Sequence, residues 1–331
     1  MQIFNIFDNL ERMHNNIKTG KGKDDVLKQE INILNKKFQT TRGYFDLLKG
    51  KSDPQDENDL KICSFVIIYA SEVLEAITKI IKKRETMPEK SFSDENKNVL
   101  KNPLNSIHML LVHYLDIFKE VLILNENNFI YGAISRSRSL LEMFFIFHYL
   151  FCNPESFERY SDHGFLRYIE RSKKWKIPLR ASEIERYEQI KIKYNDEYGK
   201  FIKNYGWVKE IKNPNGIGGL IDLFTNVNDD KTIFYLKDWY KVLSEFSHSS
   251  FFIVSRPERK YVPDFLPWAI IYCLEMLRAY TDYLVDKFKL SEIEYLPDII
   301  GGLIGIIINN IQPYHPNTDY KNIVNTNDNY K

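Results

Sequence analysis

The sequence has few cysteines, almost no excess charge of either sign and no apolar run of membrane-spanning length. Three cysteines occur among 331 residues, far apart and within apolar stretches. This pattern argues against a disulfide framework and against a thiolate zinc site, since both need cysteines in pairs. The 46 basic and 45 acidic residues nearly cancel. That balance excludes a whole-protein basic field that would attract nucleic acid, although it leaves room for a local basic patch.

The sequence also predicts that no segment crosses a membrane. The stretch Ile299–Ile308 is uncharged and strongly apolar, but it is about half as long as the roughly 20 residues that a spanning helix needs. Asp298 precedes it and Asn309 follows it, so we expect a helix that is buried or covered by a partner, with a membrane-surface element as the lesser alternative. Charged residues interrupt the apolar pattern of residues 1–16, which argues against a signal peptide. We therefore expect a cytoplasmic protein.

Common catalytic and nucleotide-binding motifs are absent. The sequence contains no G-x-x-x-x-G-K-[ST] phosphate loop, no strand-linked G-x-G-x-x-G, no H-E-x-x-H and no G-x-S-x-G. These absences disfavour nucleotide hydrolases, dinucleotide-dependent enzymes, zinc proteases and esterases. We predict no cofactor.

Helical periodicity runs through nearly the whole chain, and no segment alternates as a strand does. We predict an all-α fold, a helical bundle with an N-terminal helical hairpin and a C-terminal apolar helix. The polar stretch 84–103 is the best linker candidate. It separates the hairpin region, 1–90, from the main bundle, 104–290, which residues 291–331 follow as an apolar helix and a polar tail. The predicted helices are 26–48, 60–84, 104–124, 129–151, 154–175, 181–205, 231–254 and 263–288.

The segment 129–151 carries charges within a helix that is apolar nearly all round. Arg138 and Glu142 are one helical turn apart, and Arg136 lies nearby. A helix of this kind is usually buried, and a buried charge is costly unless it is paired. Two interpretations stay open. Either Arg138 and Glu142 pair and tie neighbouring helices together, or the three charged residues belong to an internal polar site.

A second polar constellation lies in the segment 231–254. Tyr240, Ser244 and His248 recur every four residues and share a helical face. Hydroxyl groups and Glu245 flank His248, so its ring could be oriented and its pKa tuned for proton transfer. The alternative is a core histidine that a serine or a carbonyl satisfies.

A metal centre is the weakest of the site hypotheses. Glu11–His14 and Glu245–His248 both have the Glu-x-x-His spacing of di-iron carboxylate bundles. His113, Asp116 and Glu120 could share a third helix face. Because the first pair lies in a polar N-terminal segment, we predict no metal and keep a di-metal carboxylate bundle as a lesser alternative.

The tryptophans could form a core or a platform on which nucleic-acid bases stack. Large aromatic side chains most often dominate cores, so we expect all four to be packing residues. They are Trp175, Trp207, Trp239 and Trp268.

Two motifs resemble those of a bacterial family catalogued as a domain of unknown function. They are Arg136-Ser-Arg138-Ser-Leu-Leu-Glu142 and Tyr240-x-x-Leu-Ser244-x-x-Ser-His248-x-Ser250. The resemblance covers about residues 105–290 and implies no activity. More loosely, the arrangement is similar to HEPN, a superfamily of helical nucleotide-binding domains. Many HEPN domains are metal-independent ribonucleases of bacterial defence and toxin systems.

Two function classes follow from these patterns. The first is an intracellular helical interaction module, in which buried polar residues specify packing. It would belong to a bacterial defence or stress system and bind a partner protein there. We also predict a homodimer or larger oligomer, because an uncovered apolar segment at 299–308 would cause aggregation.

The second class, which the HEPN resemblance implies, is a metal-independent ribonuclease that acts on RNA. His248 would exchange protons with the ribose 2′-hydroxyl and the leaving oxygen, and an arginine would stabilise the charge of the transition state. The supporting residues would be Arg138 or Arg136 for that charge, Glu142 to hold the arginine, and Tyr240 and Ser244 to orient His248.

The substitution His248→Ala separates the two classes. If His248 packs in the core, its loss should lower stability by about 1–3 kcal/mol through a cavity and an orphaned hydrogen-bond partner. If it is a general acid or base, the variant should stay folded and lose on the order of 10²–10⁴ in rate. Thermal melts, bacterial growth and total RNA integrity, compared between wild type and variant, distinguish these outcomes.

Overall fold

The computed structural model describes residues 25–36, 54–85, 104–212, 214–227, 239–241, 243–244 and 261–311. These residues form helices joined by turns, and none of them lies in a strand. The prediction of an all-α bundle is confirmed. Most of the predicted helix 231–254, including His248, lies outside the described residues.

The chain forms two compact units, and α4 (Leu104–Glu126) and α5 (Ile130–Cys152) each run from one into the other. The first unit comprises residues 1–99, 108–141 and 239–331. The second comprises residues 100–107 and 142–238.

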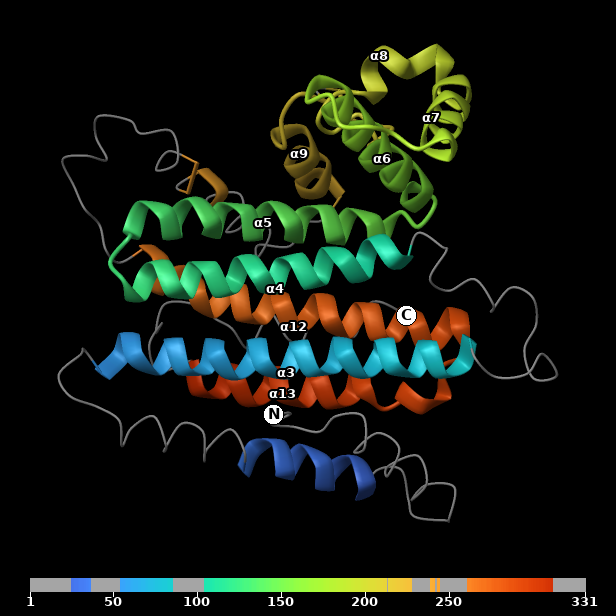
Figure 1. The fold of residues 1–331 in the computed structure, drawn as a ribbon. Helices are drawn as coiled ribbons and strands as arrows, with labels where there is room; N and C mark the ends of the chain where they lie inside the picture. The colour runs from blue at the N-terminus through green and yellow to red at the C-terminus, as the bar shows by residue number, and fades with distance from the viewer. Residues whose placement is uncertain are drawn as a thin grey trace. The chain divides into compact units, whose positions relative to one another are not determined.

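The first unit is organised around α12 (Tyr261–Phe288), which packs against α3 (Pro54–Glu85) and α13 (Leu296–Ile311). Figure 1 shows these long helices lying side by side. From residue 265 to residue 277, every side chain of α12 is buried except that of Glu275. A helix that is apolar on all sides must be surrounded by other elements. The hydroxyl of Tyr114 donates a hydrogen bond to the carbonyl of Ala269 at 3.0 Å, which ties α4 to α12.

The apolar segment Ile299–Ile308 is covered by its own unit. Ile300, Leu303 and Ile307 are completely buried within α13. Gly302 lets this helix approach the helix of residues 25–36, because a Cβ at that position would lie 2.7 Å from Cδ1 of Ile31. The premise that this segment needs a second subunit to cover it is therefore wrong. Within the described part of the chain, no helix is long and apolar enough to cross a membrane.

The second unit contains two packed antiparallel helices, α6 (Ser156–Lys174) and α7 (Ala181–Lys193). The predicted helix 181–205 ends early, at Lys193. A 3₁₀ turn (Asn195–Glu197) and the short α8 (Tyr198–Phe201) follow it, and α9 (Gly218–Val227) completes the unit. Phe201 and Tyr194 stack at 3.9 Å between ring centroids, so the broken segment folds back on itself instead of continuing as a helix.

The expectation that all four tryptophans are core residues is wrong at one position. Trp207 and Trp268 are buried, and Trp239 is half-buried against Phe265. Trp175 is 67% exposed. It caps the C-terminus of α6, beyond the apolar stripe that holds this helix against the rest of the unit.

Two glycines of the second unit should respond in opposite directions to alanine. At Gly206 a Cβ would lie 2.1 Å from the backbone oxygen of Lys200, so Gly206→Ala should destabilise the fold by about 1–3 kcal/mol or more. Gly164 lies within α6 with open space around it. Gly164→Ala should therefore stabilise the fold by about 0.5–1 kcal/mol. Urea titrations of both variants measure the difference, and equal effects would contradict the packing around Gly206.

Candidate functional site

Two residues that the sequence assigns to separate constellations meet in the first unit. The guanidinium of Arg138, on α5, donates a hydrogen bond to the hydroxyl of Tyr240 at 3.0 Å. Its Cζ also lies 5.2 Å from the centroid of the tyrosine ring, within the range of a cation–π interaction. The contact spans 102 positions of sequence. It joins the Arg-Ser-Leu-Leu-Glu helix to the segment that precedes His248.

The other sequence-predicted site residues differ in their surroundings. Arg136 forms an ion pair with Glu120 at 2.7 Å, and about half of each side chain is exposed. Glu142 and Ser244 are half-buried. His248 lies outside the described residues, so its predicted role stays a prediction.

The prediction that α5 buries its charges is wrong for the arginines. Arg136 is exposed and Arg138 is half-buried. The buried face of α5 passes through Ala133, Ser137 and Leu140, so Arg136 and Arg138 lie on either side of it. Neither arginine is fully enclosed, so neither carries the full electrostatic cost of a buried, unpaired charge.

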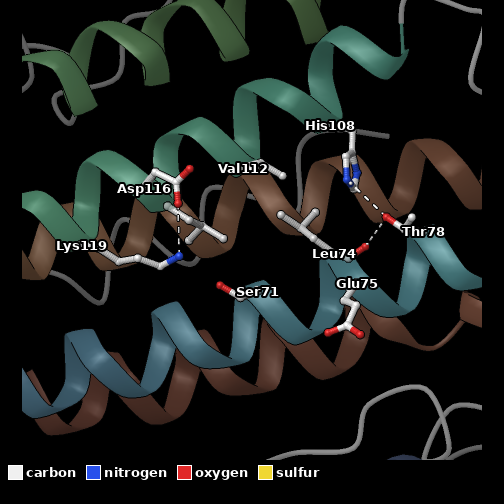
Figure 2. A pocket seen from close by; sticks show the side chains of 9 residues that line it. Ser71, Leu74, Glu75, Thr78, His108, Val112, Asp116 and Lys119 are labelled. Atoms are coloured by element: carbon white, nitrogen blue, oxygen red, sulfur yellow. Dashed lines mark hydrogen bonds and ion pairs between the residues drawn. The ribbon is translucent and has the colours of Figure 1, made fainter. Parts of the chain in front are cut away.

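A pocket of about 290 Å³ lies between α3 and α4 of the first unit. Figure 2 shows His108 at one end of it and Asp116 and Lys119 at the other. His108 contacts the hydroxyl of Thr78 at 3.4 Å and that of Tyr280 at 3.3 Å. Burial lowers the pKa of His108, so the ring is neutral near pH 7. Both ring nitrogens of His108 contact hydroxyls, and neither contact supplies the negative charge that would activate the ring as a base.

Sequence reasoning missed this pocket for a physical reason. The partners of His108 lie 30 and 172 residues away. Helical periodicity shows which residues share a face, but it does not show which faces of distant helices meet.

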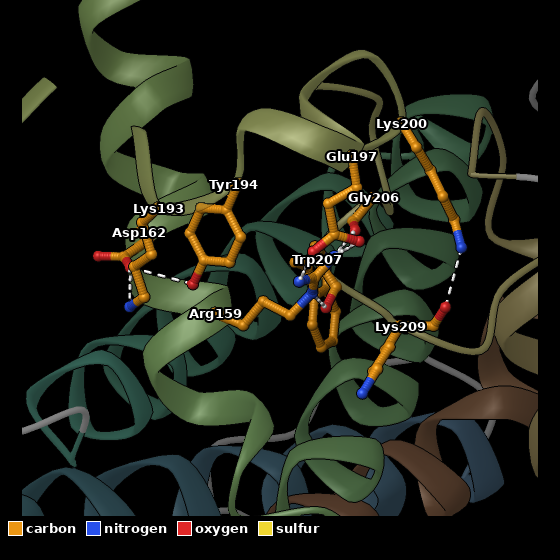
Figure 3. A network of polar contacts seen from close by, with 9 residues as sticks. All are labelled: Arg159, Asp162, Lys193, Tyr194, Glu197, Lys200, Gly206, Trp207 and Lys209. Carbon is orange, nitrogen blue, oxygen red and sulfur yellow. Dashed lines mark hydrogen bonds and ion pairs between the residues drawn. The ribbon is translucent and has the colours of Figure 1, made fainter. Parts of the chain in front are cut away.

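A network of polar contacts surrounds Arg159 in the second unit (Figure 3). Both terminal nitrogens of this arginine donate to the carboxylate of Glu197. Its Nε donates to the carbonyl of Trp207 at 2.8 Å, and a terminal nitrogen donates to the carbonyl of Gly206 at 3.1 Å. Arg159 is only 13% exposed. The hydrogen bonds from Arg159 lower the pKa of Glu197 and keep it ionised.

Further contacts extend this network along α6. Lys193 lies between Asp162 and Glu158, at 2.8 and 2.7 Å. Burial by itself lowers the pKa of Lys193, but the hydrogen bonds to both carboxylates outweigh it and raise the pKa. His163 is buried and donates from Nε2 to the carbonyl of Lys203 at 2.7 Å. These bonds satisfy groups that the fold itself buries, so the network holds the irregular segment after α7 in place.

Metal coordination finds no support among the described residues, where no three His, Cys, Asp or Glu side chains gather. His113, Asp116 and Glu120 are all exposed. Asp116 contacts Lys119, and Glu120 contacts Arg136. Both Glu-x-x-His pairs lie outside the described residues.

Comparison with known proteins supports the resemblance to an uncharacterised family. Residues 104–256 match the model of a family of unknown function (DUF5677). This range includes both motifs and the whole of the second unit's helical hairpin. No curated protein and no solved structure matches the chain.

Two arginine substitutions should distinguish a structural network from a surface pair. Arg159→Met leaves Glu197 and two carbonyls without their donor, and it should destabilise the fold by about 3–5 kcal/mol. Arg136→Met breaks an exposed ion pair and should cost about 0–1 kcal/mol. Urea unfolding of the two variants measures both values. A small effect of Arg159→Met would contradict its structural role.

Proposed function

We propose that the chain is a helical interaction module that associates with a second copy of itself through the turn between α4 and α5. The single observation that carries this proposal is a cluster of exposed apolar side chains at that turn. Phe129 is 64% exposed, and Ile123 and Tyr131 are also exposed. Large apolar side chains that gather on a surface are typical of protein–protein contacts.

The backbone of this turn supports the proposal because it is held in one conformation. Asn128 adopts a positive φ of 61°, which asparagine tolerates better than most residues. The amide of Phe129 donates to the carbonyl of Leu124 at 2.8 Å, and that of Asn128 donates to the carbonyl of Asn125 at 3.1 Å. A preorganised turn loses little conformational entropy when it binds. The apolar side chains are therefore presented at low cost.

The polar groups of the described residues favour a binding role over catalysis. Burial lowers the pKa of His108, of His163 and, to about 4, of His148. Each of these rings is neutral near pH 7, and a general acid at that pH would need a higher pKa. The Arg159 network likewise serves the fold.

Light scattering at micromolar protein concentration tests the proposed self-association. Wild type should have the mass of a dimer, because apolar burial at the turn drives association. Phe129→Asp should shift the mass to that of a monomer without changing the circular dichroism spectrum. Met109→Asp is the matched control, since Met109 is also an exposed apolar residue, at 56%, but lies near the start of α4, far from the turn. A monomeric wild type, or dimers in both variants, would refute self-association at this turn.

The ribonuclease is the second candidate, and the contact between Arg138 and Tyr240 favours it. Tyr240 lies two helical turns before His248 in the predicted helix. The arginine beside Tyr240 would serve the His248-dependent reaction if the helix predicted from the sequence runs on to His248. The defence or stress setting comes from the same HEPN resemblance. The comparison of wild type with His248→Ala in bacteria tests this candidate. Intact RNA and equal growth in both would exclude it.

A further inference from the structure

A local basic patch does exist, at the end of α6 and in the connection to α7. Residues 171–180, the basic segment, read Arg-Ser-Lys-Lys-Trp-Lys-Ile-Pro-Leu-Arg. They contain five cations and no acidic residue. Apart from Ser172 and Leu179, every residue of the segment is exposed. Because the net charge of the whole chain is close to zero, this local excess of positive charge is not evident from the composition.

In the described part of the chain, the cations of the basic segment lack the ion pairs that cations further along α7 form. Lys193 lies between two carboxylates, Arg186 pairs with Asp162, and Lys191 pairs with Glu188. Within the described part of the chain, no ion pair includes Arg171, Lys173, Lys174, Lys176 or Arg180. One end of the α6–α7 pair is therefore compensated and the other carries an unbalanced positive charge.

Exposed apolar side chains lie among these cations. Trp175 is the most exposed of them, and Ile177 follows it two residues later. Tyr168 and Ile184 are exposed on the adjoining turns of α6 and α7. The hydroxyl of Tyr168 contacts Glu183 at 3.4 Å, so the two helices meet there. The surface thus combines a tryptophan, a tyrosine and two isoleucines with five positive charges.

The backbone conformation holds a cation where glycine is favoured. Lys176 has a φ of 57°. The amide of Ile177 donates to the carbonyl of Ser172, and that of Lys176 donates to the carbonyl of Lys173. These are the bonds of a Schellman motif, whose left-handed residue is usually glycine because a Cβ is strained there. A lysine at this position therefore carries a backbone strain that glycine would avoid. What lysine adds over glycine is its charged side chain.

We propose that the basic segment binds the surface of an anionic lipid bilayer, with Trp175 and Ile177 inserted at the headgroup level and the cations on the lipid phosphates. Tryptophan is favoured at the membrane–water interface. Clustered lysines and arginines are attracted to anionic lipids, and adjoining apolar side chains add to that attraction. Single-stranded RNA also binds surfaces that combine cations with aromatic rings. It would leave the two isoleucines without a partner, because an aliphatic side chain has no π-face on which a base can stack. The proposal does not depend on self-association at the α4–α5 turn.

Sedimentation of the full chain with vesicles tests the proposal. Vesicles of phosphatidylcholine and phosphatidylglycerol in equal parts should bind the protein, and vesicles of phosphatidylcholine alone should not. Binding should weaken as salt screens the charges. Equal binding to both kinds of vesicle, or to neither, would overturn the proposal.

Lys176→Gly separates binding from folding. Glycine suits the left-handed backbone, so the variant should melt at the same temperature as wild type or higher. Its affinity for the anionic vesicles should fall about fivefold, as expected for the loss of one cation near a charged membrane. The triple variant Arg171→Gln, Lys174→Gln, Lys176→Gly should lose on the order of a hundredfold. Lys191→Gln is the matched control, because its cation is already paired, and it should bind as wild type does. Unchanged binding by the triple variant would refute the assignment.

Substitutions of Trp175 distinguish a lipid partner from an RNA partner. Trp175→Leu keeps an apolar side chain that can enter a bilayer, so vesicle binding should be largely retained, whereas Trp175→Ser should lose it. Ile192→Ser, an exposed apolar residue at the compensated end of α7, is the control and should change nothing. Polyuridylate serves as the RNA probe. If polyuridylate binds more tightly than the vesicles and Trp175→Leu abolishes that binding, the surface takes nucleic acid and the lipid proposal fails.

Discussion

The first unit depends on the burial of α12. Its apolar side chains point in every direction between residues 265 and 277, so no single neighbour can cover them, and helices have to pack on more than one side. Helix α3 does so from a distant part of the sequence, and α13 does so directly after α12 along the chain. The same requirement explains α13, whose apolar residues are complementary to α12 and whose Gly302 permits a close approach by Ile31. The uncharged segment Ile299–Ile308 is thus part of the core.

Periodicity was enough to predict the all-α fold and most helix positions, because apolar spacing depends on local geometry. It failed where the chain makes contacts that local spacing does not encode. The predicted helix 181–205 stops at Lys193, and the residues that follow are held by Arg159 through Glu197 and two backbone carbonyls. A guanidinium that binds carbonyls gives no sequence signal on the acceptor side, since any residue supplies a carbonyl.

The candidate site could be predicted only in part, for a related reason. Arg138 and Tyr240 stood out because each is a polar residue in an apolar helical pattern, and they do meet. Their pairing with each other was not predictable, since a phenol is not the partner that charge alone suggests for an arginine. Trp175 was placed in the core because tryptophan usually is buried. Its neighbours in sequence, three lysines within two positions on either side, were the signal that could have identified an exposed position.

Three of the described histidines are poorly suited to proton transfer at neutral pH. His108, His148 and His163 all have a pKa below the ordinary value because burial penalises the charged ring. Proton transfer at neutral pH needs a ring that can exist in both states, and a nearby carboxylate is the usual way to keep the charged state accessible. His163 binds a backbone carbonyl, and His108 contacts two hydroxyls, neither of which supplies a negative charge. The proposed ribonuclease draws on none of these three rings. It rests on His248, which Glu245 precedes by three positions, and on Arg138 beside Tyr240. A binding module would equally contain histidines that are buried or half-buried and an arginine that contacts a phenol. The exposed apolar turn therefore carries the functional argument.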